Sequence, residues 1–357
     1  MAAAFGSLEW YLEVGRTIDA LYREELHRPA EYEGSVNWLF HAREEGKDAE
    51  WIRTQIRDSY EWHAVHDIPP FTPLPRILAN GQHFKLADGS RFVAIEATDF
   101  QLYQRFLTGE DIVPILEQRQ AAGINMLRVL GMCSGMFHLF PQEHGDYYGG
   151  LAGFADLLAR YGLYLEFVAF ADATVVMPTA SQQLMHWAQI GEALRNSTNI
   201  LVEAVNEADI PINRLVSLQE LRALPGILCS HGSNGAEQPP VIPFWGYSTF
   251  HTNGAFEEQR KVGHNAMEIW HGPTLTNETS RFPDVGMWRN ASAERVRDLA
   301  FGAGAGAALL CAGACAHTVN GKFSQPWDVA ELEMVKSLVA GLKSVDLSHQ
   351  NQAYHHR

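Results

Sequence analysis

The chain has 357 residues, of which 46% are hydrophobic and 19% charged, so it can bury a large core and is not intrinsically disordered. Lys and Arg number 27 against 42 Asp and Glu, and the formal charge of −15 argues against nucleic acid and anionic membranes as partners. Four scattered cysteines give no disulfide framework, and no metal-binding motif occurs, so we expect buried free thiols, no metal and no cofactor.

The N-terminal part of the chain has a helical pattern. Glu9 interrupts the first apolar residues and no basic segment precedes them, so we expect no signal peptide; extracellular, virion-associated and cytoplasmic locations stay open. Apolar residues at helical spacing predict helices over 8–26, 31–45 and 48–66. A Pro-rich linker, 69–76, follows. We predict a helical domain over 1–68, the alternative being a helical cap packed on the main domain.

Strands and helices alternate after the linker. A hairpin turning at Asp88 and Gly89 comes first. Eight strands are predicted at 92–97, 125–130, 164–170, 200–205, 227–230, 246–250, 274–276 and 307–311, and helices at 111–122, 181–195, 293–301 and 329–342. The uncharged run 299–316 is too rich in Gly and Ala for a membrane span. The order indicates a (β/α)₈ TIM barrel over 77–345 with a polar tail, 346–357; a doubly wound open sheet is the alternative.

Polar side chains follow several of the predicted strands. In chain order they are Arg128, Asp172, the pair Asn206 and Glu207, His251, Glu278 and, near the last strand, His317. In a (β/α)₈ barrel the active site is built from the C-terminal ends of the strands. The pattern therefore brings two glutamates, an Arg, an Asn and a His to one site.

Two of these strand ends resemble motifs of glycoside hydrolase clan A, the (β/α)₈ group that includes cellulases and mannanases. "ILVEAVNEAD" is similar to the fourth-strand motif of the clan and "TLTNETSRF" to the seventh, and the likeness extends over 77–342. The resemblance implies Glu207 as acid/base, Glu278 as nucleophile, Asn206 on the sugar 2-hydroxyl and Arg128 orienting the nucleophile. It also implies an oligo- or polysaccharide substrate.

Some positions depart from the clan pattern. Ala208 replaces a common Pro, Asn253 replaces a common Tyr, and no Trp ends the eighth strand. Trp288 and Trp327 lie in the loops after the last two strands and are candidates for stacking on sugar rings, the alternative being that they are core residues. Together with Asp172, His251 and His317 they complete the predicted substrate-binding set. The sugar, the linkage and the choice between internal and terminal cleavage stay open.

The residues themselves agree with this chemistry. Glycoside cleavage needs one carboxylic acid and one carboxylate, and retention of configuration needs them about 5–5.5 Å apart. Strand alternation would place Glu203, Val205 and Glu207 on one face, with Glu203 deeper as a hydrogen-bonded structural group. We therefore predict a retaining glycosidase that uses Glu207 and Glu278.

Other interpretations stay open. Asn206 could cap a helix, Glu278 could be a solvated loop carboxylate, Arg128 could form a structural salt bridge, and the two histidines could belong to the core. The stretch "YREELHRPAEYEGSVNWLF" resembles a small helical module of bacterial surface and secreted proteins. A non-catalytic carbohydrate-binding or structural protein of a virion or cell surface, attached through these helices, is therefore the alternative function. A metal-dependent barrel hydrolase lacks ligands in the sequence.

Overall fold

The fold is described from a computed structural model. It describes residues 7–26, 30, 32–57, 73–81, 83–232, 246–251, 273–278, 306–308, 324–327 and seven positions between 329 and 340. Of the predicted elements, the helix over 293–301, the tail 346–357 and residues 58–66 of the third helix lie outside these ranges. None of the described helices is long and apolar enough to span a membrane.

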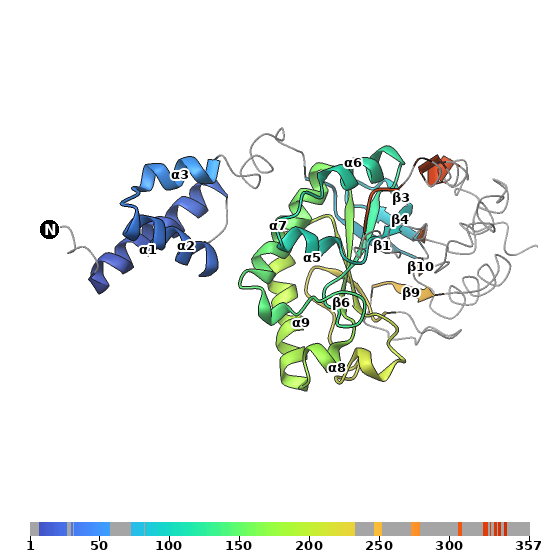
Figure 1. Ribbon diagram of the computed structural model, residues 1–357. Coiled ribbons are helices and arrows are strands. Elements are labelled where there is room, and N and C mark those ends of the chain that lie inside the picture. Colours follow the sequence, from blue (N-terminus) through green and yellow to red (C-terminus); the bar gives the residue numbers. More distant parts are fainter. Residues whose placement is uncertain are drawn as a thin grey trace, which may run out of the picture.

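Three helices form near the N-terminus, as the apolar spacing predicts. They are α1 (Leu8–Glu25), α2 (Tyr32–Glu44) and α3 (Ala49–Arg57), drawn in blue in Figure 1. The Ser7 hydroxyl caps α1 by accepting a hydrogen bond from the Trp10 N–H. Ile18, Leu21, Tyr22, Leu26, Ile52 and Ile56 form a buried cluster between α1 and α3. The three helices therefore have an apolar cluster of their own.

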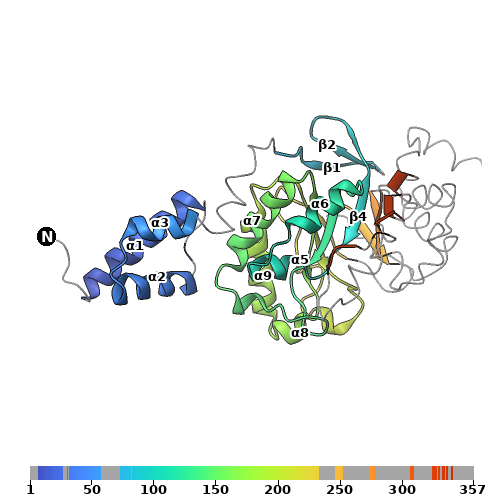
Figure 2. The same ribbon diagram turned by 45° about the horizontal axis from the view of Figure 1, so that its top comes forward.

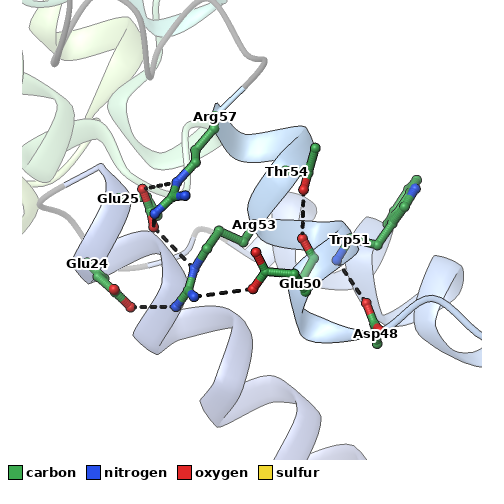
Figure 3. A network of polar contacts seen from close by, with 8 residues as sticks. All are labelled: Glu24, Glu25, Asp48, Glu50, Trp51, Arg53, Thr54 and Arg57. Carbon is green, nitrogen blue, oxygen red and sulfur yellow. Dashed lines mark hydrogen bonds and ion pairs between the residues drawn. The ribbon is translucent and has the colours of Figure 1, made fainter.

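Ion pairs join α1 to α3 beside that cluster (Figure 3). The Arg57 guanidinium donates to both carboxylate oxygens of Glu25, at 2.8 and 2.9 Å. Arg53 lies 2.8 Å from Glu24 and 3.4 Å from Glu50. Because Glu25 is buried and held by two cations, this network fixes how α1 and α3 pack.

The rest of the described chain is built on one eight-stranded parallel sheet. Its strands are β4 (Ala94–Thr98), β5 (Met126–Leu130), β6 (Tyr164–Phe170), β7 (Ile200–Val205), β8 (Leu228–Ser230), β9 (Ser248–His251), β10 (Thr274–Glu278) and β11 (Gly306–Ala308). They lie in the order β8-β7-β6-β5-β4-β11-β10-β9, and all the pairs are parallel. Each of the eight predicted strands therefore has a counterpart, and β6 and β7 have the predicted bounds.

Helices follow the strands and cover the sheet. They are α5 (Leu102–Leu107), α6 (Val113–Ala121), α7 (Tyr147–Arg160), α8 (Ala173–Val176) and α9 (Ala180–Leu194), with short 3-10 turns η1 (Pro141–Glu143) and η2 (Pro211–Asn213). Both views show α7 and α9 side by side along one side of the sheet (Figures 1 and 2). A capping box between Thr179 and Gln182 starts α9. Described residues between 329 and 340, Leu332 and Val335 among them, are helical as predicted.

A small antiparallel sheet covers the N-terminal ends of the strands. It consists of β1 (Ile77–Asn80), β2 (His83–Leu86) and β3 (Arg91–Phe92), and the predicted turn at Asp88 and Gly89 joins the last two. One buried cluster joins this sheet to the first residues of the large one: Ile77, Phe84, Phe92, Ala94, Met126, Tyr164, Leu201, Tyr247 and Leu275. Residues from both halves of the strand order thus share one cluster.

The two outer strands of the large sheet also approach each other. The N–H groups of Gly246 and Tyr247, just before β9, donate to the Cys229 carbonyl in β8 at 2.9 and 3.2 Å. The Ser230 and Thr249 hydroxyls lie 3.4 Å apart. Side-chain and backbone contacts therefore connect the first and last strands of the order.

Candidate functional site

The C-terminal end of β7 carries the pair Asn206 and Glu207. β7 ends at Val205, and the Asn206 N–H still donates to the Phe170 carbonyl of β6 at 2.8 Å. Glu207 then has φ +48°, in the left-handed region that non-glycine residues rarely adopt. Such strain in ordered structures gathers at functional sites. Strand alternation therefore does not extend to Glu207, contrary to our expectation from the sequence.

One buried asparagine holds this turn. The Asn213 amide donates to the Asn206 carbonyl at 2.6 Å and to the Glu207 carbonyl at 3.3 Å. Its side-chain oxygen accepts from the N–H of Asp172 at 2.9 Å, and Asp172 is also left-handed, with φ +52°. Asn213 thus joins the ends of β6 and β7, although no motif in the sequence identifies it.

Arg128 lies beneath Asn206 and is fully buried. Its Nε donates to the Glu203 carboxylate at 2.7 Å, and its Nη2 donates to the Asn206 side-chain oxygen at 2.9 Å. The predicted structural role of Glu203 agrees with this ion pair. The arrangement directs the Asn206 oxygen inward, which leaves the amide NH₂ of Asn206 as its outward donor.

Asp172 organises the loop after β5. Its Oδ2 accepts hydrogen bonds from the N–H groups of Ser134 and Gly135, at 2.8 and 3.0 Å, and from the Ser134 hydroxyl. Burial by itself raises the pKa of Asp172, but these hydrogen bonds outweigh it and the pKa lies below its ordinary value. The carboxylate therefore stays ionised and binds the backbone of a neighbouring loop.

The second predicted carboxylate ends β10. Glu278 is the last residue of that strand, and its register partner in β9 is His251, also the last of its strand. The register shifts between Thr276 and Glu278, and such bulges often lie next to active sites. The backbone thus places Glu278 and His251 side by side, at the same end of the sheet as Glu207.

Three further predicted residues have different outcomes. Trp288 and His317 lie outside the described residues. Trp327 is 4% exposed, and its ring packs 3.7 Å from the Arg119 guanidinium, while its backbone bonds to the Gln118 side chain of α6. The indole is therefore a packing group, because burial against α6 leaves no open face for a sugar ring. Its position in a loop did not reveal this.

Several residues of the site escaped the sequence interpretation. His231 directly follows β8 and is buried, so it occupies one of the two strand ends, the first and the fifth, for which no candidate was named. Glu96 and Glu166 lie inside the sheet with Arg128, and Tyr247 donates to Glu166 at 2.6 Å. Glu96 and Glu166 each lie within an apolar predicted strand, which could have identified them as buried polar residues. We drew that inference from the sequence for Glu203 alone.

The described residues contain no group of three or more His, Cys, Asp and Glu side chains arranged to hold a metal ion. Cys133 and Cys229 are free and buried, as expected for these two thiols. Burial raises the pKa of the Cys229 thiol to about 12, so this thiol is not a nucleophile at neutral pH. Among the described side chains, the polar groups gathered at the strand ends include carboxylates, amides, an imidazole, the Ser134 hydroxyl and the Arg128 guanidinium.

Comparisons with known proteins give similarity of fold. No family model matches the sequence, and no curated protein matches it. Among solved structures, the catalytic domain of the Thermobifida fusca endoglucanase Cel5A, in complex with cellotetraose, has a TM-score of 0.50 at 15% identity over 79% of this chain and 99% of its own. A family 5 glycoside hydrolase from Bacteroides vulgatus has a TM-score of 0.51 at 12% identity, covering 65% of this chain and 61% of its own.

A further structure described as a glycoside hydrolase has a TM-score of 0.54 at 13% identity, over 74% of this chain and 75% of its own. The chain spans 61% of the length of that Bacteroides vulgatus family 5 enzyme and 62% of the length of a second glycoside hydrolase structure from the same organism. At such identities the likeness establishes the fold alone. The α/β fold of this chain is thus similar to that of family 5 enzymes of clan A.

Proposed function

We propose that this protein is a retaining glycoside hydrolase with Glu207 as acid/base and Glu278 as nucleophile. The observation that carries the proposal is the end of β7, where Asn206 is held by Arg128 and Glu207 is held in a left-handed turn. A strained backbone clamped by a buried amide is costly, and such strain persists where geometry is needed for a reaction. The likeness of the fold to family 5 enzymes supports the same assignment.

The two carboxyl groups belong to strands that a closed barrel would bring together. In the strand order, β7 and β10 each lie one place from an outer strand. We infer that the sheet closes between β8 and β9 into a (β/α)₈ barrel, which the Cys229 hydrogen bonds and the shared apolar cluster at the strand N-termini support. Only β8 and β9 then separate Glu207 from Glu278.

The proposed reaction has two steps. In the first, the Glu207 carboxylic acid gives its proton to the leaving glycosidic oxygen while the Glu278 carboxylate attacks the anomeric carbon, forming a glycosyl ester. In the second, the Glu207 carboxylate takes a proton from water, and the resulting attack on the ester releases the sugar and Glu278. The Asn206 amide NH₂ would bind the 2-hydroxyl of the sugar.

The substrate would be an oligo- or polysaccharide. The endoglucanase structure of similar fold holds cellotetraose, a neutral oligosaccharide, and the net charge of −15 suits a neutral ligand better than nucleic acid or an anionic membrane. Asp172, His251, His317 and Trp288 are the remaining proposed substrate-binding residues. Trp327 is not among them, because it is buried.

A screen of aryl glycosides of both anomeric configurations tests the proposal. We expect Glu207→Gln and Glu278→Gln each to lower kcat by about 10²–10⁴-fold or more with little change in Tm, because each removes a reacting group. Glu192→Gln, a change on the exposed face of α9, is the matched control and should match wild type. Hydrolysis that both site variants retain would refute the assignment, and so would the absence of hydrolysis of every glycoside by a folded wild type.

The acid/base role of Glu207 and the nucleophile role of Glu278 can be distinguished with a substrate whose leaving group needs no acid and with azide as an added nucleophile. Glu207→Ala should still form the glycosyl ester from a dinitrophenyl glycoside, whose leaving group needs no acid, and azide should then speed turnover and yield a glycosyl azide of retained configuration. Glu278→Ala should not form that ester. Release of inverted sugar by wild type would contradict the double displacement, because two successive inversions at the anomeric carbon give net retention.

A further inference from the structure

Four ionisable side chains lie together inside the large sheet. Glu96 of β4, Arg128 of β5, Glu166 of β6 and Glu203 of β7 are each 0% exposed. If all four were ionised, three negative charges would face one positive charge in a dry interior. An isolated buried carboxylate is costly, and such groups take up a proton instead.

Arg128, the only cation among these four side chains, already forms an ion pair with Glu203. Arg128 Nε lies 2.7 Å from Glu203 and 3.8 Å from Glu166. Glu166 has a different donor, because the hydroxyl of Tyr247, just before β9, bonds to its Oε1 at 2.6 Å. The ion pair therefore belongs to Glu203, and Glu166 is held by a neutral hydroxyl.

Glu96 receives no such donor. Within the described part of the chain, no N–H or O–H group hydrogen-bonds to either of its carboxyl oxygens or to Oε2 of Glu166. What faces Glu96 is the Glu166 carboxyl, and the two side chains interact directly. Two carboxyl groups can satisfy each other only when one of them carries a proton.

We propose that Glu96 and Glu166 bind one proton between them, and that this proton leaves Arg128 directed at Glu203 and Asn206. Without it, Glu166 would carry a full negative charge 3.8 Å from Arg128 and compete with Glu203 for the guanidinium. With it, the pair presents one negative charge, which the Tyr247 hydroxyl helps to stabilise. Glu96 is in these terms a positioning residue that acts on Arg128 through Glu166.

The surroundings favour the protonated state. Burial raises the pKa of Glu96 well above its ordinary value, and the charge of Glu166 raises it further, while Arg128 opposes both. Burial, followed by the charge of Glu203, also raises the pKa of Glu166. Among the residues that the structure describes, Tyr247 and, next to its hydroxyl, Ser230 of β8 are the further polar groups recorded beside the pair, and neither is a cation.

Infrared difference spectroscopy tests the proton directly. A non-ionised carboxyl group has a C=O stretch that a carboxylate lacks, and we expect this band at pH 7 in the spectrum of wild type minus that of Glu96→Gln, in which carboxyl groups common to both proteins, such as Glu207, cancel. Glu96→Gln should remove it without changing the circular dichroism, because the amide of the substituted side chain can donate to Glu166 in place of the proton. Glu192→Gln, at an exposed position, should leave the band in place. A difference spectrum of wild type minus Glu96→Gln without the band would overturn the proposal.

The stability profile with pH gives an independent measurement. A carboxyl group whose pKa is raised by folding stabilises the fold below its unfolded pKa of about 4.3, and that stability is lost as pH rises through the folded pKa. Above about pH 5 the unfolding constant of wild type should therefore rise relative to Glu96→Gln, by about tenfold per pH unit. The two proteins should agree near pH 4. Equal profiles of the two proteins across this range would refute the bound proton.

Glu96→Ala separates the proton from the packing. Alanine supplies no donor, so Glu166 should then compete for Arg128, and exchange of the Arg128 Nε–H with solvent should become faster than in wild type. Glu96→Gln should restore the slow exchange. If the alanine and glutamine variants exchange this proton equally fast, the pair does not position Arg128. None of these measurements depends on glycoside hydrolysis, so they stand apart from the proposed function.

Discussion

Two non-glycine residues at neighbouring strand ends adopt the left-handed region, and one side chain holds both. Asp172 has φ +52° and Glu207 has φ +48°. Each such residue costs on the order of 1–3 kcal/mol, so the surrounding contacts must compensate. Asn213 does so by accepting from the Asp172 N–H and donating to two carbonyl groups at the end of β7. The orientation of the proposed acid/base Glu207 therefore depends on Asn213, a residue that does not itself transfer a proton in the proposed reaction.

Asn213→Asp should show this dependence. Aspartate has the size of asparagine but cannot donate, so its oxygen would face the Asn206 and Glu207 carbonyl groups and repel them. We expect a loss of about 1–3 kcal/mol of stability and a fall in kcat that exceeds any rise in KM. Chemical denaturation and steady-state kinetics on the aryl glycoside found in the screen would measure both.

Asn213→Gln is the matched comparison for that variant. It keeps the amide but lengthens the side chain inside a buried site, so it should also misplace the turn. Full activity in both variants would mean that the strain at Glu207 is held by other contacts and that Asn213 is dispensable.

At the scale of elements, the end of β7 depends on how closely β8 passes it. Gly232, two residues after β8, has φ +102°. A Cβ there would lie 1.7 Å from the Val205 carbonyl oxygen, the last residue of β7. That oxygen belongs to the backbone and cannot rotate away. Only glycine allows the two chains to approach at the point where the Asn206–Glu207 turn begins.

Gly232→Ala should therefore damage both the fold and the site. We expect destabilisation well above the ~1 kcal/mol typical of point substitutions, together with lost turnover, because the end of β7 must move. Gly153→Ala in α7 is the control: its new methyl group would lie 3.8 Å from Phe106, and alanine should stabilise the helix by about 0.5–1 kcal/mol. Thermal melts of the two variants should shift in opposite directions. A Gly232→Ala protein that melts with wild type would show that this approach is not required.

The same elements show what sequence can and cannot predict. β6 and β7 are continuous apolar runs with clear ends, and both were predicted with their observed bounds. The turn at Glu207 was not, because strand alternation was extended past a backbone that Asn213, six residues later, bends. Likewise, the pairing of Arg128 with Glu203 rather than with Glu96 or Glu166 depends on distances across the sheet, which no local pattern contains.

At the scale of the whole molecule, the two ends of the strands have different roles: apolar packing at the N-terminal ends and the proposed site at the C-terminal ends. The apolar cluster at the strand N-termini is closed by Ile77, Phe84 and Phe92 of the small sheet. The buried charges of the large sheet, at Glu96, Arg128, Glu166 and Glu203, lie further along the strands, and the strained residues Asp172 and Glu207 follow the C-terminal ends of β6 and β7. Stability and the proposed chemistry are thus separated along the strand direction, as is usual for (β/α)₈ enzymes.

The helices α1, α2 and α3 are organised differently. The apolar side chains of α1 and α3 bury one another, and the Trp38 indole N–H donates to the Tyr22 hydroxyl at 2.8 Å. The ion pairs of Arg53 and Arg57 are also made with residues of α1 and α3 themselves. These interactions are local to the three helices, and a Pro-rich segment follows them. Such a unit is a candidate for a separate domain.

A chain beginning at Pro69 tests that division. If residues 1–68 form their own domain, the shortened protein should stay monodisperse, melt within a few degrees of wild type and keep its turnover of aryl glycosides, because no buried contact of the large sheet is lost. A chain beginning at Val93 is the control: it also lacks Ile77, Phe84 and Phe92, so it exposes the cluster beneath the strands and should aggregate. Aggregation of the Pro69 chain as well would mean that the helices cover apolar surface of the sheet domain, and the helical cap, not a separate domain, would be the correct description.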